Sequence, residues 1–439
     1  MTKKQFKNLL KNTIKVPKDA GWLIPGLEVK RWFSLIIIGV TLSILGLCIM
    51  LNLKPIYWLL SVLLKMVRVL PSEFIGLGLI IVGAYFFLKG WAKTNYSILN
   101  VSDQRERKDI LEDLYRRRKL NKGPKIVAIG GGTGLSTLLK GIKKLSNNIT
   151  AVVTVGDDGG SSGRLREEMG VLPPGDIRNC IAALADAEDL VTKLFQYRFK
   201  SGKGIEGHSF GNLFLTALCS ITGDMLRAVK ESSRVLSIRG RVLPSTLSDM
   251  RLVAKMDTGE IVKGESNIPE AEGKIIELAC EPSDCKTLPE IIIAIQEADL
   301  IIMGPGSLYT SVIPNLLIKD ISEAISKSKA KKIYVCNVMT QPGETDGYSV
   351  SDHLDAIIRH AKVSSRLIDA VLVNDNFPEN ALEKYKEANQ EPVEIDDDEI
   401  RDMGIQVVRR RLIEENTGNL VRHSPQRVAR AIHYWYHRG

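Results

Sequence analysis

The sequence predicts an α/β protein with a doubly wound, mostly parallel sheet and a small β-rich insertion, preceded by an α-helical transmembrane hairpin. From Lys125 onward, short apolar strands alternate with segments of helical periodicity, a pattern typical of parallel sheets covered by helices on both faces. Before that point, two apolar runs are long enough to cross a bilayer. These two observations set the class of fold.

The two apolar runs are Phe33 to Leu53, and Phe74 to Leu88 extended through Trp91. Between them, Ile56 to Leu70 carries Lys65 and Arg68 at helical spacing and is interpreted as an interfacial helix or an extension of the second span. Basic residues before and after the hairpin favour a cytoplasmic location for both ends. We therefore expect a multi-pass protein of the cell membrane with two spans.

Composition supports this arrangement. The net charge is +9, and eight Lys or Arg residues within the first thirty-one face only Asp19 and Glu28. A second basic cluster, Arg116 to Lys119, follows the hairpin, so anionic lipid is the expected partner and nucleic acid is not. Six cysteines show no C-x-x-C spacing, which indicates free thiols in a reducing, cytoplasmic compartment.

We divide the chain into a basic cytoplasmic N-terminus (residues 1–32), the hairpin (33–92), a charged helical linker (93–123) and an α/β domain (124–439). The stretch from Val235 to Ala279 is interpreted as the β-rich insertion. The strand candidates after the first are Thr150–Val155, Val235–Leu243, Arg251–Met256, Lys274–Ala279, Leu300–Met303, Lys332–Cys336 and Ala370–Val373.

The first strand runs straight into a glycine cluster, after which Leu135, Leu138 and Ile142 recur at helical spacing. Strand, tight turn and helix in this order predict a phosphate site formed by Gly131, Gly132, Thr133 and Gly134, because the helix N-terminus presents unpaired N–H groups. A tight turn without a ligand is the alternative. The dinucleotide pattern G-x-G-x-x-G fails here, and the lysine of a P-loop is absent.

The second strand ends in two adjacent carboxylates, Asp157 and Asp158, followed by Ser161 and Ser162. In a parallel sheet these side chains share the carboxyl edge with the glycine cluster, where such folds bind ligands. The two acids could hold Mg²⁺ or a sugar hydroxyl. No cofactor is required for binding in this interpretation, and Mg²⁺ is an option that the two acids leave open.

Two further loops carry polar residues at the start of helices. Asp176, Arg178 and Asn179 follow a Pro-Pro-Gly turn, where Asp176 is either an N-cap or a ligand-binding residue. His208 and Asn212 are spaced to share one helix face if a helix has begun. Together with Asp157 and Asp158, His208 is a candidate catalytic residue.

The remaining candidates follow two later strands. We expect a second anion-binding loop, formed by Gly306, Ser307, Thr310 and Ser311. Within it, Tyr309 could stack on a base or sugar. After the next strand, Asn337, Thr340 and Gln341 could read sugar hydroxyls or a base edge. Several polar, glycine-rich loops at the ends of parallel strands predict one crevice for a nucleotide-like ligand.

The motifs GGGTG, GDDGGSSGRLR, PPGDIRN, GHSFGNL, GPGSLYTS and NVMTQPGETDGYSVSDH together resemble the CofD-like superfamily, and within it the bacterial gluconeogenesis factors of the YvcK or GlmR type. The resemblance runs from about Lys125 to the C-terminus and includes Arg422-His-Ser-Pro425. It implies a Rossmann-like fold that binds UDP-sugars, notably UDP-N-acetylglucosamine, in support of peptidoglycan precursor supply and cell shape. The sequence departs from most of the family in its first hundred or so residues.

Carried over motif by motif, the resemblance assigns Gly131 to Gly134, Asp157 and Asp158 to the nucleotide, and Gly306, Ser307 and Tyr309 to the diphosphate and sugar. It also implies a cytoplasmic partner enzyme of the glutamine:fructose-6-phosphate aminotransferase type. Whether the chain forms a homo-oligomer is left open.

Two other functions stay open at this point. One is a Mg²⁺-dependent nucleotidyl or phospho-group transferase, resembling either the 2-phospho-L-lactate transferases or a uridylyltransferase, because phosphoryl-type transfer needs little beyond positioning and a metal. The other, a nicotinamide-dependent oxidoreductase, is disfavoured by the missing dinucleotide pattern.

Overall fold

The computed structural model describes residues 29–68, 71–99, 116–186, 188–364, 366–376, 389–413 and 422–438. The chain separates into two compact units, Met1–Lys119 and Leu120–Gly439. The second unit begins four residues before the predicted boundary, because Leu120 is already buried in it. The expected linker lies partly at residues 100–115, outside the described residues, and residues 116–121 are helical.

Within the described residues, the apolar part of the first unit consists of the helices α2 (Val29–Met50), α3 (Lys54–Val67) and α4 (Ser72–Leu99). By length and composition, Ser72–Gly90 of α4 could cross a membrane, with a mean hydropathy of 1.6. The parts of α2 and α3 from Leu35 to Lys65 are apolar enough to form a second span, but they are bent by 98° at the break between them. The predicted apolar helices are present, and α3 occupies the position of the expected interfacial helix.

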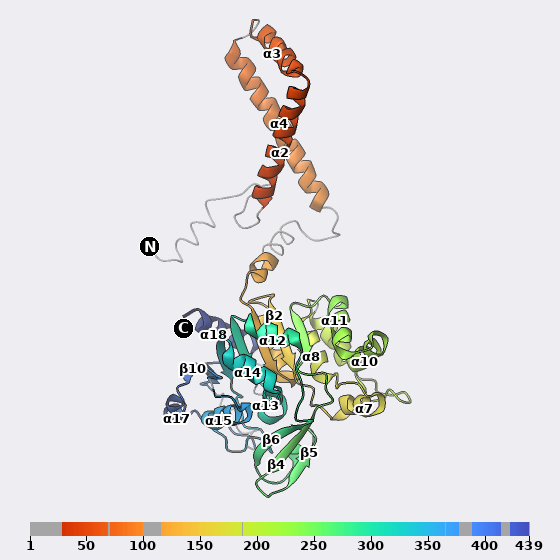
Figure 1. The fold of residues 1–439 in the computed structure, drawn as a ribbon, viewed down its shortest axis with the longest axis vertical. Helices are drawn as coiled ribbons and strands as arrows, with labels where there is room; N and C mark the ends of the chain where they lie inside the picture. Colours follow the sequence, from red (N-terminus) through yellow and green to blue (C-terminus); the bar gives the residue numbers. More distant parts are fainter. Residues whose placement is uncertain are drawn as a thin grey trace. The chain divides into compact units, whose positions relative to one another are not determined.

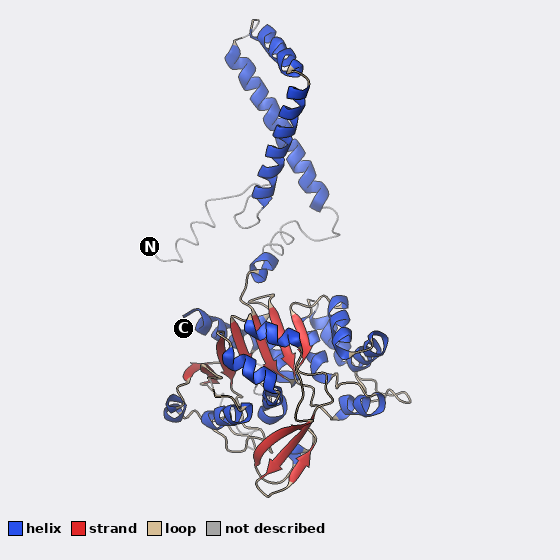
Figure 2. Ribbon diagram, viewed as in Figure 1, coloured by secondary structure: helices blue, strands red, loops and turns tan. Residues whose placement is uncertain are grey.

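The second unit is built on a seven-stranded parallel sheet with the order β10-β9-β8-β7-β1-β2-β3. Helices cover both faces of this sheet (Figures 1 and 2), with α6 packed against α8 and α18, and α12 against α14. Every residue of β1, β2, β7 and β9 is buried, as expected for strands that are covered on both sides. The strands of the main sheet are β1 (Ile126–Gly130), β2 (Ile149–Val153), β3 (Arg241–Pro244), β7 (Leu300–Met303), β8 (Lys331–Val335), β9 (Ala370–Asn374) and β10 (Gln406–Arg410).

The predicted insertion exists but is shorter than expected. It is a three-stranded antiparallel sheet of β4 (Arg251–Met256), β5 (Ile261–Lys263) and β6 (Ile275–Glu281). The prediction of a strand over 235–243 was wrong at its start, because α11 ends at Val235 and only Arg241–Pro244 is extended. That strand pairs in parallel with β2, so it belongs to the main sheet.

The helices of the second unit follow the predicted alternation. Leu135, Leu138, Leu139 and Ile142 of α6 are all buried, which confirms the helical spacing after the glycine cluster. The helices are α6 (Gly132–Ile142), α7 (Gly160–Met169), α8 (Gly175–Leu184), α9 (Glu188–Gln196), α10 (Phe210–Thr222), α11 (Met225–Val235), α12 (Pro289–Gln296), α13 (Ile313–Leu317), α14 (Lys319–Lys327), α15 (Val350–Ala361), α17 (Asp397–Asp402) and α18 (Pro425–Arg438).

The order in which the strands are added to the sheet reverses at β1. The chain runs outward from β1 through β2 to β3, and β7 then pairs with the opposite side of β1. In doubly wound sheets this switch point opens a crevice at the carboxyl ends of the strands. The loops after β1 and β7 meet there so closely that a Cβ atom on Gly134 would lie 2.2 Å from the carbonyl oxygen of Pro305.

We predict that Gly134→Ala destabilises the α/β unit by about 1–3 kcal/mol, because backbone atoms of a neighbouring loop must move to admit the methyl group. Urea unfolding of residues 100–439 would measure the loss. Gly159→Ala is the matched control, since its Cβ would meet its nearest neighbour at an ordinary 3.6 Å. Equal stability of Gly134→Ala and wild type would refute the close approach of the two loops.

Candidate functional site

A pocket of about 370 Å³ lies at the switch point, between the loops that follow β1, β7 and β8. Seven of the residues predicted from the sequence line it: Thr133, Gly134, Gly306, Ser307, Asn337, Thr340 and Gln341. Arg422 and His423, from the segment before α18, complete the wall. The structure thus brings together the first and the last two polar loops of the predicted crevice.

The glycine cluster has two roles in this site. Gly132 has a φ of +60°, and a Cβ on Gly131 would lie 2.6 Å from a carboxylate oxygen of Asp176, so close packing alone requires glycine. At the same time α6 begins at Gly132, and Thr133 and Gly134 of its first turn line the pocket. The first N–H groups of a helix have no partner within it, so this turn suits an anion.

The opposite wall is held in place by its own hydrogen bonds. The side chain of Asn337 accepts from the Gly306 N–H at 3.2 Å and donates to the Gly306 carbonyl at 2.8 Å. The Ser307 hydroxyl donates to Gln341 at 2.7 Å, and Gln341 donates to Glu344 at 2.7 Å. These contacts fix the polar side chains before a ligand arrives, which reduces the entropy lost on binding.

The predicted stacking role of Tyr309 does not fit its position. The side chain is fully buried, its hydroxyl lies 2.9 Å from the hydroxyl of Tyr348, and its ring packs edge-on against Tyr348 and His360. Thr310 is also buried and donates to Glu344 at 3.3 Å. The side chains of Tyr309 and Thr310 therefore pack in the interior beneath the loop after β7. The Ser311 hydroxyl lies next to the glycine cluster, 3.6 Å from the Cβ position of Gly132.

Glu344, in the loop after β8, is a buried carboxylate that joins this network. Besides Gln341 and Thr310, it accepts from the backbone N–H of Tyr309 at 3.2 Å. Burial raises its pKa to about 7, so it titrates near neutral pH. Its role is to tie the loop after β7 to the loop after β8.

The acidic residues form a second cluster on the other side of the glycine cluster. Asp176 accepts from the Gly132 N–H, and burial followed by the charge of Asp157 raises its pKa to about 6. It is therefore not the N-cap of α8, which is Pro174. Glu265, on the insertion, was not predicted as a site residue, and burial followed by the charges of Asp157 and Asp176 raises its pKa to about 8.

The two acids that the sequence offered as a Mg²⁺ option each accept backbone N–H groups. Both carboxylate oxygens of Asp158 accept backbone N–H groups of the insertion, from Glu265 at 3.0 Å and Ser266 at 2.9 Å. One carboxylate oxygen of Asp157 accepts from the Gly159 N–H at 3.0 Å. Within the described residues, no three His, Cys, Asp or Glu side chains lie together in a way that could hold a metal ion. Asp158 instead fastens the insertion to the loop after β2.

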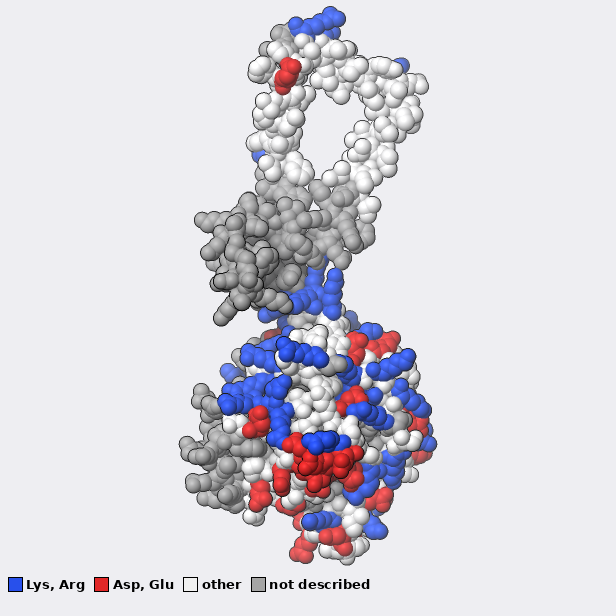
Figure 3. All heavy atoms as spheres, turned by 90° about the vertical axis from the view of Figure 1, so that its left-hand side faces the viewer, with Lys and Arg blue, Asp and Glu red and all other residues white. Residues whose placement is uncertain are grey.

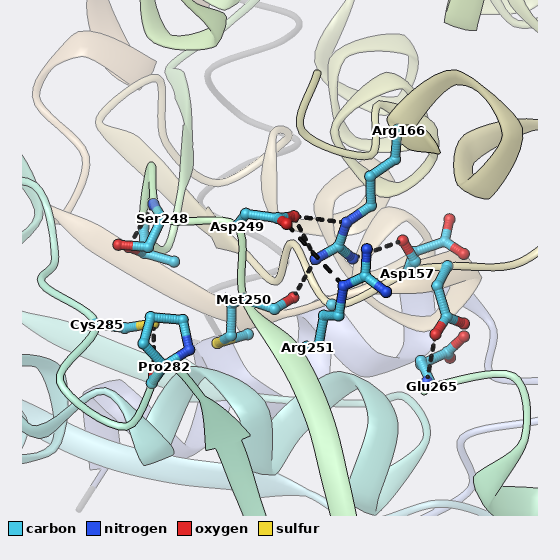
Figure 4. Close-up of polar contacts among 12 residues, drawn as sticks. Asp157, Arg166, Ser248, Asp249, Met250, Arg251, Glu265, Pro282 and Cys285 are labelled. Atoms are coloured by element: carbon cyan, nitrogen blue, oxygen red, sulfur yellow. Dashed lines mark hydrogen bonds and ion pairs between the residues drawn. The ribbon is translucent and has the colours of Figure 1, made fainter. Parts of the chain in front are cut away.

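The buried Arg166 strengthens this junction (Figure 4). It donates to the carboxylate of Asp249 at 2.7 Å, to the Met250 carbonyl at 2.7 Å and to the Asp157 carbonyl at 3.4 Å. The backbone that carries Asp157 is therefore fixed against the start of β4. The insertion is thus held at the crevice by Asp158 and Arg166 together.

Ser161, His208 and Asn212 meet in the same cluster. The Ser161 hydroxyl lies 3.0 Å from Nδ1 of His208 and accepts from the Asn212 amide at 3.0 Å. The condition for a common helix face is not met, because α10 begins only at Phe210, but both side chains still reach one serine. Burial, and then the charge of Arg164, lowers the pKa of His208, which favours the neutral imidazole.

The other three candidates complete this cluster. Ser162 is buried, with its hydroxyl 2.5 Å from the Cβ position of Gly175. Arg178 donates to the Ser209 hydroxyl at 2.5 Å and to the Asn179 side chain at 3.0 Å, so it holds α8 against the start of α10. Burial lowers the pKa of Arg178. The predicted residues thus divide between the pocket and this neighbouring polar cluster.

Comparison with known proteins identifies the relatives of this chain. The family described as 2-phospho-L-lactate transferase CofD matches residues 126–413. The gluconeogenesis factor of Bacillus subtilis is 49% identical over 311 residues, which cover 71% of this chain and 97% of that protein. The chain belongs to the CofD-like family of gluconeogenesis factors.

A solved member of this family has the same α/β fold. The crystal structure of protein BH3568 from Bacillus halodurans is 48% identical, has a TM-score of 0.68, and covers 71% of this chain and 99% of that one. The fold class and the family resemblance predicted from the sequence are both confirmed. A relative from Nostoc sp. is 52% identical over 420 residues, which cover 94% of this chain and 92% of that protein. Some family members are therefore similar over nearly the whole chain, the N-terminal unit included.

We predict that Glu265→Gln stabilises the α/β unit at high pH. The Glu265 carboxyl has a pKa of about 8 in the folded state, whereas its ordinary value is 4.5. Between these two pH values the folded state therefore binds more protons than the unfolded state. Stability therefore falls as pH rises through this window, and the substitution removes that loss. We expect the variant to exceed wild type by about 1–3 kcal/mol near pH 9, less than the full shift implies because the group is partly solvated.

Urea unfolding between about pH 4 and 9 would measure this difference. Glu260→Gln is the control, because Glu260 is exposed in the same insertion. Parallel pH profiles for wild type and Glu265→Gln would show that Glu265 is not held in a buried acidic cluster.

Proposed function

We propose that this chain is a membrane-tethered regulator that binds a UDP-sugar, UDP-N-acetylglucosamine being the expected ligand. In this proposal it adjusts amino-sugar and peptidoglycan precursor metabolism, and thereby cell shape, by contacting another protein. The family resemblance implies that this partner is an enzyme of the glutamine:fructose-6-phosphate aminotransferase type. The observation that carries the proposal is the polar pocket at the switch point of the sheet.

The chemistry of the pocket suits the parts of a nucleotide sugar. The first turn of α6 and the charge of Arg422 lie on its wall and favour a diphosphate. Ser307, Asn337 and Gln341 offer donors and acceptors for hydroxyl and amide groups. Val338 and Met339 add an apolar surface against which a sugar or base ring can pack.

We predict that Arg422→Ala weakens binding of UDP-N-acetylglucosamine by about ten- to a hundredfold, the range for loss of a charge-assisted contact. Titration calorimetry of residues 100–439, with and without Mg²⁺, would measure it. Arg401→Ala is the control, since Arg401 is exposed, pairs with Asp398 and does not line this pocket. Unchanged affinity in Arg422→Ala would place the diphosphate elsewhere.

The membrane attachment is a separate part of the proposal. The apolar side chains of Leu35 to Met50 and of Phe74 to Leu88 are almost all exposed, so both helices need an apolar environment. Basic residues on both sides of the hairpin favour cytoplasmic ends.

We predict that the full chain sediments with membranes after lysis and is released by detergent but not by high salt, whereas residues 100–439 stay in the supernatant. Fractionation followed by immunoblotting would measure this. Release of the full chain by salt alone would mean that it is held only at the surface by charge. Recovery of the full chain in the supernatant would contradict the proposed membrane attachment.

A second candidate function is a group transferase. Acids with raised pKa values beside a pocket are a feature of catalytic sites, and the Ser161–His208 contact supplies a hydroxyl next to a neutral base. Incubating residues 100–439 with UTP, a sugar phosphate and Mg²⁺ separates the two candidates. Formation of a UDP-sugar that is lost in His208→Ala would favour the enzyme, and saturable binding without product would favour the regulator.

A further inference from the structure

The edge strand β10 leaves part of its backbone open. Within the described residues, β10 pairs only with β9. The Gln406 N–H donates to Asp369, and the Arg410 carbonyl accepts from the Asp375 N–H. In a parallel pair, alternate residues direct both backbone groups to the same side, so those of Val407 and Arg409 face away from β9. These groups can pair with an added strand.

A groove of about 280 Å³ runs along this open edge. All five residues of β10 line it, together with Tyr434, Trp435 and Arg438 of α18. The indole N–H of Trp435 donates to the Gln406 side chain at 2.9 Å, which fixes α18 beside the strand. Helix α18 therefore forms one side of the groove.

The charge of the groove is positive. Arg409, Arg410 and Arg438 line it, and no Asp or Glu does. The Arg409 guanidinium is paired with Asp397 of α17, so Arg410 and Arg438 supply the charge of the groove. The guanidinium groups of Arg410 and Arg438 lie 5.3 and 4.3 Å from the ring centre of Tyr434, which is 43% exposed. Figure 3 shows an area of Lys and Arg on this side of the α/β unit, beside a cluster of Asp and Glu. The Arg410 side chain also donates to the Arg409 carbonyl at 2.6 Å, where a partner strand would donate instead.

From these observations we infer that β10 docks an extended acidic segment of a partner protein as an added β-strand, with its carboxylates on Arg410 and Arg438. The backbone groups of Val407 and Arg409 supply the pairing, and the arginines supply selectivity for negative charge. A second copy of this chain fits less well, because it would bring the arginines of two β10 strands close together.

The open edge is connected to the ligand pocket through the backbone. Beyond β10 the chain continues to Ile413, which pairs with His423, and His423 and Arg422 line the pocket. The Ile413–His423 pairing therefore links the strand that would dock a partner to the residues that line the ligand pocket. This inference rests on the proposed function in one respect, since a regulator that acts on another protein needs a docking surface.

The test measures fluorescence anisotropy of a short labelled peptide of alternating Glu and Val, titrated with the full chain in detergent micelles. A peptide with Lys in place of Glu is the matched probe. We expect tighter binding of the acidic peptide, weakened by salt. Arg410→Glu and Arg438→Glu should each weaken it by about tenfold or more, while Arg430→Glu, on the same helix outside the groove, should not.

Val407→Pro tests strand addition itself. It removes one outward N–H and leaves the bonds to β9, which proline on an edge strand tolerates. We expect about tenfold weaker peptide binding with an unchanged circular dichroism spectrum. Full binding in Val407→Pro, equal loss in Arg430→Glu, or no preference for the acidic peptide would each overturn the inference. Self-association of the full chain that Val407→Pro abolishes would assign the edge to a second copy and overturn it as well.

Binding of UDP-N-acetylglucosamine is measured on the same samples. The groove variants should retain it, because their substitutions lie outside the pocket. If wild type binds the acidic peptide but not the nucleotide sugar, the proposed ligand fails and the docking edge stands. If it binds the nucleotide sugar but not the peptide, the reverse holds.

Discussion

The close approach of two loops at the centre of the sheet is the constraint on which the site depends. The loop after β7 passes directly over the start of α6, and there is no room for a side chain on Gly134 beneath Pro305. Because of this contact the first turn of α6 and the residues after β7 both line the pocket. The same turn is held from the other side by Asp176, which accepts the Gly132 N–H. Gly131 and Gly134 are therefore required by close packing and Gly132 by its positive φ, and they also leave the backbone N–H groups accessible to a ligand.

The α6 turn also separates two chemical environments. On one side the pocket combines amides, hydroxyls and Arg422, which suit an anion. On the other side, burial and then the charge of Asp157 raise the pKa values of Asp176 and Glu265. An anionic ligand is favoured on the first side and opposed on the second. The insertion, fastened by Asp158 and Arg166, keeps this acidic group beside the crevice.

Much of the fold could be predicted from the sequence, because buried parallel strands are continuous apolar runs and the loops between them are rich in glycine. The polar loops after β1, β7 and β8 were predicted for the same reason. Tyr309 was misplaced because its neighbours are polar, whereas its partners, Tyr348 and His360, are distant in sequence. Glu265 reaches the site by tertiary packing, which no local pattern reveals. Arg422 belongs to a motif of the family resemblance, but its place in the pocket also depends on tertiary packing. Strand β3 was obscured because a short edge strand and an insertion strand have similar patterns.

A crystal structure of residues 100–439 with UDP-N-acetylglucosamine would test the central claim most directly. The pocket at the switch point predicts the diphosphate at the N–H groups of Thr133 and Gly134, with Arg422 beside it and the sugar near Asn337 and Gln341. A ligand bound instead over Asp157, Ser161 and Glu265 would contradict this assignment and favour a site for group transfer.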